Sequence, residues 1–211
     1  MSEALGFVRE RMASYPGDWL LGGGWAVDAW LGGVTRSHGD IDVVVFEDEQ
    51  RLAFEHLRDW DMVAHDALDP TQERDLWDGR ALTLPAHVHA RPRDQASPAN
   101  LLRWVTPPYK PLADDENVEL IINERRDGRW LLDAAKGIDI AWQDAVAESP
   151  WGLPTAVPEV LLFYKATDYR AQGREKPRPH DQQDFDALFP HLAPPARRWL
   201  EEALERMGER R

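Results

Sequence analysis

The sequence predicts an α+β fold, with a mixed part of strands and helices first and an all-helical part after it. Two observations support this prediction. Up to about Ser149, short runs rich in β-branched residues alternate with segments of helical period. After that point, only segments with the 3.6-residue period of helices remain. We therefore expect one domain at residues 1–150 and a helical subdomain at residues 151–211.

The elements of the first part follow from periodicity and from the glycine and proline positions. An amphipathic helix over Leu5–Met12 should end before Pro16. The Val-rich Ile41–Phe46 is apolar enough for a central strand that is covered on both faces. The segments between and after them are expected as a strand, a helix, a helix and a strand: Trp19–Leu21, Trp25–Leu31, Glu47–Trp60 and Asp61–His65.

The later segments are defined mainly by prolines and turn residues. The proline-rich Pro85–Glu116 is expected as a long loop, and long loops in compact domains are often functional. Asn117–Asn123 and Arg129–Leu132 flank a turn that is typical of a hairpin. The other segments are expected as a strand, a linker and three helices: Arg80–Leu84, Pro154–Val157, Pro158–Arg170, His180–Phe189 and Ala193–Met207.

Composition limits the classes of function. The 211 residues include no cysteine, which excludes disulfides and thiolate metal sites and favours a cytoplasmic protein. No apolar run is long enough to span a membrane, and Met1–Ala4 lack the features of a signal peptide. The net charge of −13 disfavours a nucleic-acid partner and favours a cationic small molecule, although acidity also serves solubility. Composition leaves the oligomeric state open.

The motif with the clearest chemistry joins a glycine-rich turn to an acidic pair. An apolar run ends in Gly22-Gly23-Gly24, a short helical segment follows, and the next strand opens at Asp40 and Asp42. Glycines let a backbone approach a phosphate, and the helix after them offers unpaired N–H groups to an anion. Alternate strand residues share a face, so the two carboxylates lie together and favour Mg²⁺. The motif predicts a nucleoside-triphosphate and metal site.

These residues resemble a known family. Gly22–Ala29, Leu31–Arg36, His38 and Asp40-Ile41-Asp42 are similar to the aminoglycoside 2″-nucleotidyltransferases and to the lincosamide nucleotidyltransferases, both in the polymerase-β-type superfamily. A looser similarity covers Pro158–Ala166 and the segments Arg178–Asp181 and Asp184-Phe185. The resemblance implies a small mixed sheet with flanking helices and a C-terminal helical subdomain.

The resemblance also implies an activity. The enzyme would move a nucleoside monophosphate, AMP, from a nucleoside triphosphate such as ATP to a hydroxyl of a small molecule, and would release pyrophosphate. An aminoglycoside-like polycationic antibiotic is the favoured acceptor, which implies a role in antibiotic resistance. Two alternatives stay open: transfer to a protein or RNA, as in toxin–antitoxin relatives, and a non-catalytic relative that binds a nucleotide or a partner.

The resemblance assigns roles to individual residues. Asp40 and Asp42 would hold Mg²⁺, with two ions expected, and a third carboxylate would complete the ligand set or act as the base. Glu119, a lone acid in an apolar strand, is the first choice and Asp66 is its rival. The residues expected to bind the triphosphate are Gly22, Gly23, Arg36 and Lys165.

Several polar residues near these motifs have less certain roles. Asp28 is expected to fix the loop or Arg36, and the roles of His38 and His180 stay open. His87 and His89 have the spacing of a metal pair on a strand, but no third ligand is evident in the sequence, which favours a structural or surface role. Acidic residues expected to line an acceptor site are Asp66, Asp69, Asp114, Asp115 and Glu116.

Overall fold

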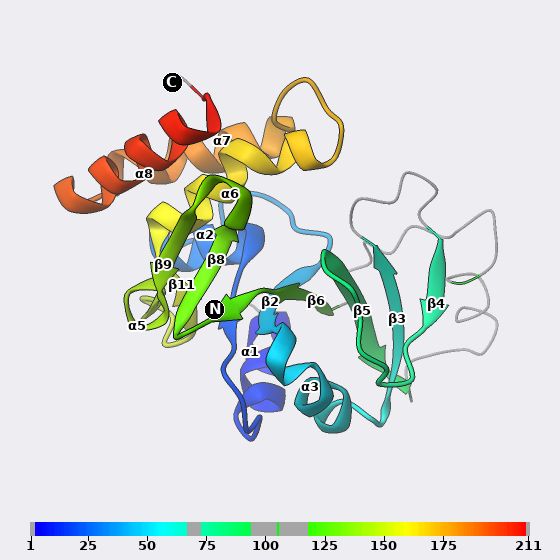
Figure 1. Cartoon of the computed structure of the whole chain (residues 1–211). Coiled ribbons are helices and arrows are strands. Elements are labelled where there is room, and N and C mark those ends of the chain that lie inside the picture. The colour runs from blue at the N-terminus through cyan, green and yellow to red at the C-terminus, as the bar shows by residue number, and fades with distance from the viewer. Residues whose placement is uncertain (1–2, 67–72, 94–104, 106–117, 210–211) are drawn as a thin grey trace. The chain divides into compact units, whose positions relative to one another are not determined.

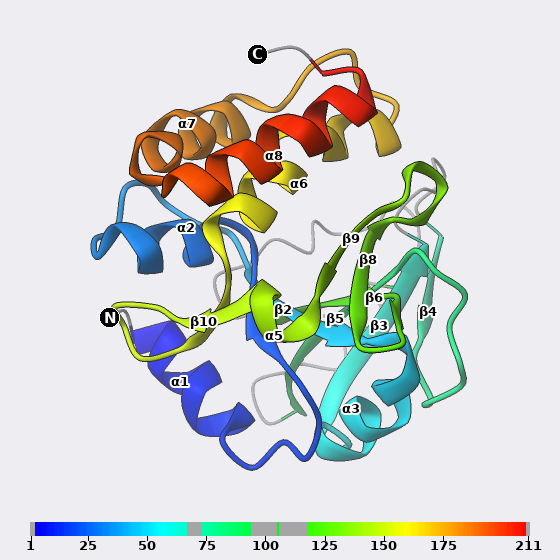
Figure 2. The same cartoon turned by 60° about the vertical axis from the view of Figure 1, so that its left-hand side comes forward.

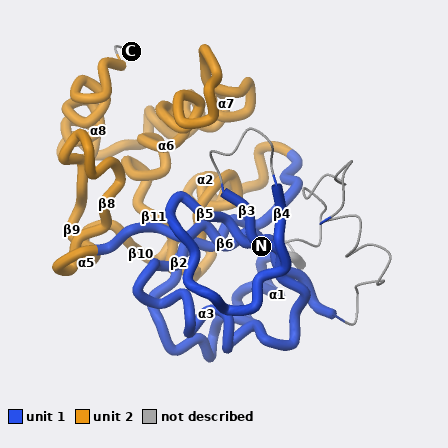
Figure 3. The backbone as a smooth tube through the Cα atoms, turned by 45° about the vertical axis from the view of Figure 1, so that its right-hand side comes forward, with its two compact units in different colours: residues 1–20, 37–125 blue, residues 21–36, 126–211 orange. Residues whose placement is uncertain are grey.

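The chain forms two compact units that are interleaved along the sequence. The computed structural model describes residues 3–66, 73–93, 105 and 118–209 (Figure 1). Unit 1 consists of residues 1–20 and 37–125, and unit 2 of residues 21–36 and 126–211 (Figure 3). The division into domains at residue 150 remains a prediction.

Unit 1 contains a mixed five-strand sheet, in agreement with the predicted fold class. Its order is β2-β6-β5-β3-β4, with β2 parallel to β6 and the other neighbours antiparallel. The strands are β2 (Ile41–Phe46), β3 (Trp60–Asp66), β4 (Arg74–Leu76), β5 (Ala86–Pro92) and β6 (Val118–Asn123). One face of this sheet is buried and apolar. Its residues include Val43, Val45, Met62, Ala64, Val88, Ala90, Leu120 and Ile122.

Two α-helices of unit 1 have bounds within the described residues. Helix α1 (Glu3–Met12) packs beside α3 (Gln50–His56), since Phe7 stacks on Trp60 at 5.6 Å and the Arg11 guanidinium donates to the carbonyl of His56 at 2.8 Å. The helix predicted over Glu47–Trp60 was too long. A 3₁₀ turn occupies Glu47–Glu49, and the buried Trp60 begins β3 instead.

Unit 2 holds the C-terminal helices and two smaller groups of strands. Leu21 of β1 (Leu20–Leu21) pairs in parallel with Thr155 of β11 (Pro154–Ala156), which pairs antiparallel with β10 (Val146–Glu148). A second sheet has the order β7-β8-β9, namely Arg125–Arg126, Arg129–Asp133 and Ile138–Ala141. Helices α6, α7 and α8 pack together (Figure 2). The helices are α2 (Gly23–Leu31), α5 (Trp142–Ala145), α6 (Pro158–Ala171), α7 (Pro179–Leu188) and α8 (Pro194–Met207), with 3₁₀ turns at Ala134–Lys136 and Phe189–His191.

The three predicted C-terminal helices are confirmed, but four strand predictions need correction. Strand β5 lies in the segment expected as a loop, and β11 occupies the expected linker. Arg80–Leu84 forms no strand. The predicted hairpin is shorter, because Asp127 and Gly128, with φ of 51° and 72°, join β7 to β8 while β6 pairs within the sheet of unit 1.

The model also allows a check for membrane spans. In the described part of the chain, every helix is too short or too polar to cross a bilayer.

Candidate active site

Three carboxylates meet on the polar face of the sheet in unit 1. Asp42 on β2 is the register partner of Glu119 on β6, so their side chains share a face, and Asp40 precedes Asp42 by two residues. The ligand oxygens of Asp40, Asp42 and Glu119 all lie within 4.8 Å of one another. A cation between three carboxylates this close would relieve their mutual repulsion, and hard oxygen donors match Mg²⁺. Asp66 lies at the end of β3, which β5 separates from β6.

Glu119 is nearly enclosed and stays ionised. It is 9% exposed, and its Oε1 accepts a hydrogen bond from His87 Nδ1 at 2.5 Å. Burial by itself would raise the pKa of Glu119, but the hydrogen bond and the charge of His87 outweigh it and hold the pKa well below its ordinary value. A carboxylate of this kind suits a metal ligand better than a base.

Three histidines surround Glu119, and this cluster was missed in the sequence. His87 and His89 point to the same face of β5. His65 on β3 lies opposite His87, and Glu119 on β6 lies opposite His89. His65 Nε2 lies 3.1 Å from His89 Nε2, which in turn lies 3.5 Å from Glu119 Oε1. Burial lowers the pKa of His65 and lowers that of His89 to about 4, so both rings are neutral at pH 7.

In unit 2, the glycine turn opens helix α2. Gly22 is the N-cap residue without a side-chain cap, and Gly23 has a positive φ of 58°. The first N–H groups of the helix therefore suit an anion. Asp28 accepts hydrogen bonds from the backbone N–H and the hydroxyl of Thr35, at 3.1 and 2.5 Å. Its predicted role in fixing the loop is confirmed.

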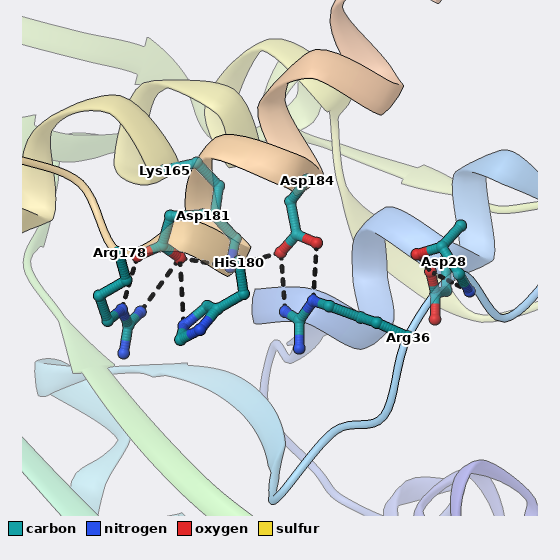
Figure 4. Close-up of polar contacts among 8 residues, drawn as sticks. Asp28, Arg36, Lys165, Arg178, His180, Asp181 and Asp184 are labelled. Carbon is teal, nitrogen blue, oxygen red and sulfur yellow. Dashed lines mark hydrogen bonds and ion pairs between the residues drawn. The ribbon is translucent and has the colours of Figure 1, made fainter.

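A second charged cluster in unit 2 contains the predicted phosphate ligands (Figure 4). Lys165 Nζ lies 2.9 Å from both Asp181 Oδ1 and Asp184 Oδ2. Arg36 binds Asp184 through Nε and Nη2, both at 2.8 Å, and Arg178 binds Asp181 from the other side. Three cationic side chains thus share two buried carboxylates, which leaves one excess positive charge in this cluster.

The electrostatics of this cluster keep both acids ionised. Burial would raise the pKa of Asp181, but hydrogen bonds and charges from Arg178 and Lys165 outweigh it and lower the pKa to about 2. The pKa of Asp184 is lowered in the same way by Arg36 and Lys165. The two acids lie on one face of α7 at a spacing of three residues, a signal that was present in the sequence but was not used.

Comparison with known proteins finds one matching family model and several solved structures with a similar fold. Residues 5–73 match the model of a family described as aminoglycoside-2″-adenylyltransferase. No curated protein sequence matches the chain. Among solved structures, the solution structure of the antibiotic-resistance factor ANT(2″)-Ia is 14% identical, with a TM-score of 0.57, and the match covers 97% of this chain and 91% of that one. The chain therefore has the fold of that resistance factor.

Two further structures show the same fold. A crystal structure of ANT(2″)-Ia in complex with adenylyl-2″-tobramycin matches with a TM-score of 0.56 and 14% identity, over 98% of this chain and 99% of that one. The lincomycin-bound lincosamide antibiotic adenylyltransferase LnuA matches with a TM-score of 0.54 and 14% identity, and the match covers 90% of this chain and 96% of that one. At this identity the structural likeness establishes the fold, while the family match covers the glycine turn, Asp40 and Asp42. A nucleotide co-substrate and a divalent ion are general to such enzymes.

The remaining residues that the sequence singled out lie outside the two clusters or at their edges. His180 lies on α7 with Nε2 at 3.8 Å from Asp181 Oδ1, and burial lowers its pKa. His38 is half-buried in the segment before Asp40. Of the acids expected to line an acceptor site, Asp66 is exposed at the end of β3. The others lie outside the described residues: Asp69, Asp114, Asp115 and Glu116.

Proposed function

We propose that this chain is a nucleotidyltransferase that transfers AMP from ATP to a hydroxyl group of an aminoglycoside-like polycationic antibiotic. The convergence of three carboxylates, Asp40, Asp42 and Glu119, is the observation that carries the proposal. It supports a metal-dependent transfer, because these oxygens fit Mg²⁺ and the fold is shared with adenylyltransferases of antibiotics. The charge of −13 supports a cationic acceptor.

The proposed mechanism divides the work among the named residues. Asp40, Asp42 and Glu119 would hold Mg²⁺, as two ions, which would neutralise charge on the triphosphate and on the acceptor oxygen as it loses its proton. Gly22 and Gly23 offer backbone N–H groups to the phosphates at the start of α2. Arg36 and Lys165 supply positive charge, with the two buried acids of α7 holding both side chains in place. The acceptor hydroxyl oxygen attacks the α-phosphorus and gives up its proton to solvent, the bond from the α-phosphorus to the bridging oxygen breaks, and pyrophosphate leaves.

The test follows the acceptor by mass. The chain is incubated with ATP, Mg²⁺ and either tobramycin or lincomycin, and the antibiotic is examined for an added AMP with release of one pyrophosphate. We expect adenylyl-tobramycin. Asp42→Asn should lower turnover at least about 100-fold, since even outer-shell partners of a metal contribute 10–100-fold.

The matched control is Asp48→Asn, an exposed acid that is not in the carboxylate group, and it should keep wild-type turnover. Circular dichroism shows whether each variant is folded. A folded Asp42→Asn protein with normal turnover would refute the carboxylate assignment. Binding of ATP without transfer to either antibiotic would favour the non-catalytic alternative, and AMP on a protein or RNA would favour the other enzyme class.

A further inference from the structure

The histidine cluster beside Glu119 has the composition of a second metal site. It draws on three neighbouring strands: His65 from β3, His87 and His89 from β5, and Glu119 from β6. Ligand atoms of His65, His87 and Glu119 all lie within 4.8 Å of one another, and His89 contacts both His65 and Glu119. Three imidazoles and one carboxylate provide four donors, the number that zinc takes in proteins.

Two of the donor spacings agree with one shared ion, while His87 Nδ1 is hydrogen-bonded to Glu119 at 2.5 Å and would have to move or bind through Nε2. Because zinc–nitrogen distances are about 2.0–2.1 Å, two ligands on a tetrahedral zinc lie about 3.3 Å apart. The His65 Nε2 to His89 Nε2 distance is 3.1 Å, and the His89 Nε2 to Glu119 Oε1 distance is 3.5 Å. One value lies just below and the other just above the roughly 3.3 Å expected between two ligands of one zinc ion. Small shifts of the side chains would therefore place these atoms at bonding distance from a shared ion.

The tautomer of His65 is already that of a ligand. His65 Nδ1 lies 3.3 Å from the carbonyl oxygen of Asp66, which accepts only, so Nδ1 carries the proton. The neutral ring then directs the lone pair of Nε2 at His89. Metal-binding histidines commonly donate their second ring N–H to a carbonyl or a carboxylate in this way.

We propose that His65, His87, His89 and Glu119 bind a borderline transition-metal ion of the Zn²⁺ class, in addition to the Mg²⁺ bound at Asp40 and Asp42. Imidazole nitrogen selects zinc, cobalt or nickel over magnesium, so the two groups differ in the ions that they prefer. Glu119 belongs to both groups and is the point at which they meet. The site itself does not depend on the proposed activity.

The test measures metal binding by the full chain without nucleotide. Equilibrium dialysis against Zn²⁺, with the metal content determined by mass spectrometry, should give one tightly bound ion for the Asp40→Asn/Asp42→Asn variant, in which the carboxylate pair is neutral. Addition of His65→Ala and His89→Ala to that variant should weaken zinc binding at least about 100-fold, because two ligands are lost. Replacement of zinc by Co²⁺ should give visible absorption bands that the histidine variant lacks.

The matched control is His191→Ala, an exposed histidine outside the cluster, and it should leave zinc affinity unchanged within about twofold. If His65→Ala/His89→Ala fails to fold, the single variants His65→Gln and His87→Gln take its place, and each should weaken binding. Two results would overturn the proposal. One is zinc affinity that is insensitive to the histidines, and the other is zinc binding that disappears when only Asp40 and Asp42 are replaced.

Discussion

Glu119 has acidic neighbours on one side and histidines on the other. Its position among Val118, Leu120 and Ile122 marked it in the sequence, because a lone acid in an apolar strand is costly without a role. The structure adds the neighbours of Glu119 on the adjacent strands, which the sequence pattern does not give. Cross-strand register places it beside Asp42 and His89, and register is not encoded in either strand alone.

Substitution of Glu119 and of Asp66 tests which of the two is the third metal-binding carboxylate. Glu119→Gln should lower turnover at least about 100-fold and raise the Mg²⁺ concentration needed for half-maximal activity, because a metal ligand is lost. Asp66→Asn, at the exposed end of β3, should leave both quantities near wild type. Turnover over a magnesium series distinguishes them, and the reverse pattern would place the third carboxylate on β3.

The buried acids of α7 predict an acid-sensitive stability. Asp181 has a pKa of about 2 in the folded chain and an ordinary value of 3.8. Its folded pKa is depressed, so its stabilisation, about 2 kcal/mol, is complete above pH 4 and is lost as the pH falls from about 4 to 2. Asp181→Asn should therefore lower the free energy of unfolding at pH 7 and flatten its dependence on pH in that window.

Urea denaturation from pH 7 down to the lowest pH at which the wild type is folded measures this effect. Asp186→Asn removes an exposed acid of the same helix and should change stability by less than about 0.5 kcal/mol. A variant at Asp181 with an unchanged acid slope would mean that its ion pairs with Arg178 and Lys165 contribute nothing to folding.

At the scale of elements, strand β5 shows where prediction from sequence failed. Ala86, Val88 and Ala90 face the core while His87, His89 and Arg91 alternate with them, which is the apolar–polar period of a strand. Flanking prolines and small apolar residues hid that period. By contrast, β2 and the helices α6 to α8 were predictable, because their apolar periods are strong and prolines mark their starts.

Replacement of glycine by alanine should have opposite effects on stability at Gly32 and at Gly6. Gly32, the C-cap of α2, has a φ of +75°, so Gly32→Ala should destabilise the chain by about 1–2 kcal/mol. Gly6 lies inside α1 with open space for a methyl group, so Gly6→Ala should stabilise it by about 0.5–1 kcal/mol. Thermal unfolding of the two variants gives the signs, and equal signs would contradict the helix-end assignment.

At the scale of the whole molecule, the net charge should determine how the affinity for the acceptor depends on salt. With a charge of −13, affinity for tobramycin should fall on the order of tenfold between about 0.05 and 0.5 M salt, since exposed charges are screened over about 10 Å at 0.1 M. A singly charged lincosamide should show little change. Calorimetry at fixed Mg²⁺ and nucleotide analogue gives the slopes. If the aminoglycoside fails to bind even at low salt, the acceptor belongs to another class.

The interleaving of the two units has a consequence for synthesis on the ribosome. Residues 21–36 emerge early, but their partners in unit 2 begin at residue 126. At about 5–20 residues per second, helix α2 waits roughly 5–18 s before the first of those partners is made. Its apolar side chains, Ala26, Val27 and Ala29, are buried in the finished chain and have no unit 2 surface to cover them during that interval. The nascent chain therefore passes through a stage in which chaperone binding to α2 competes with aggregation.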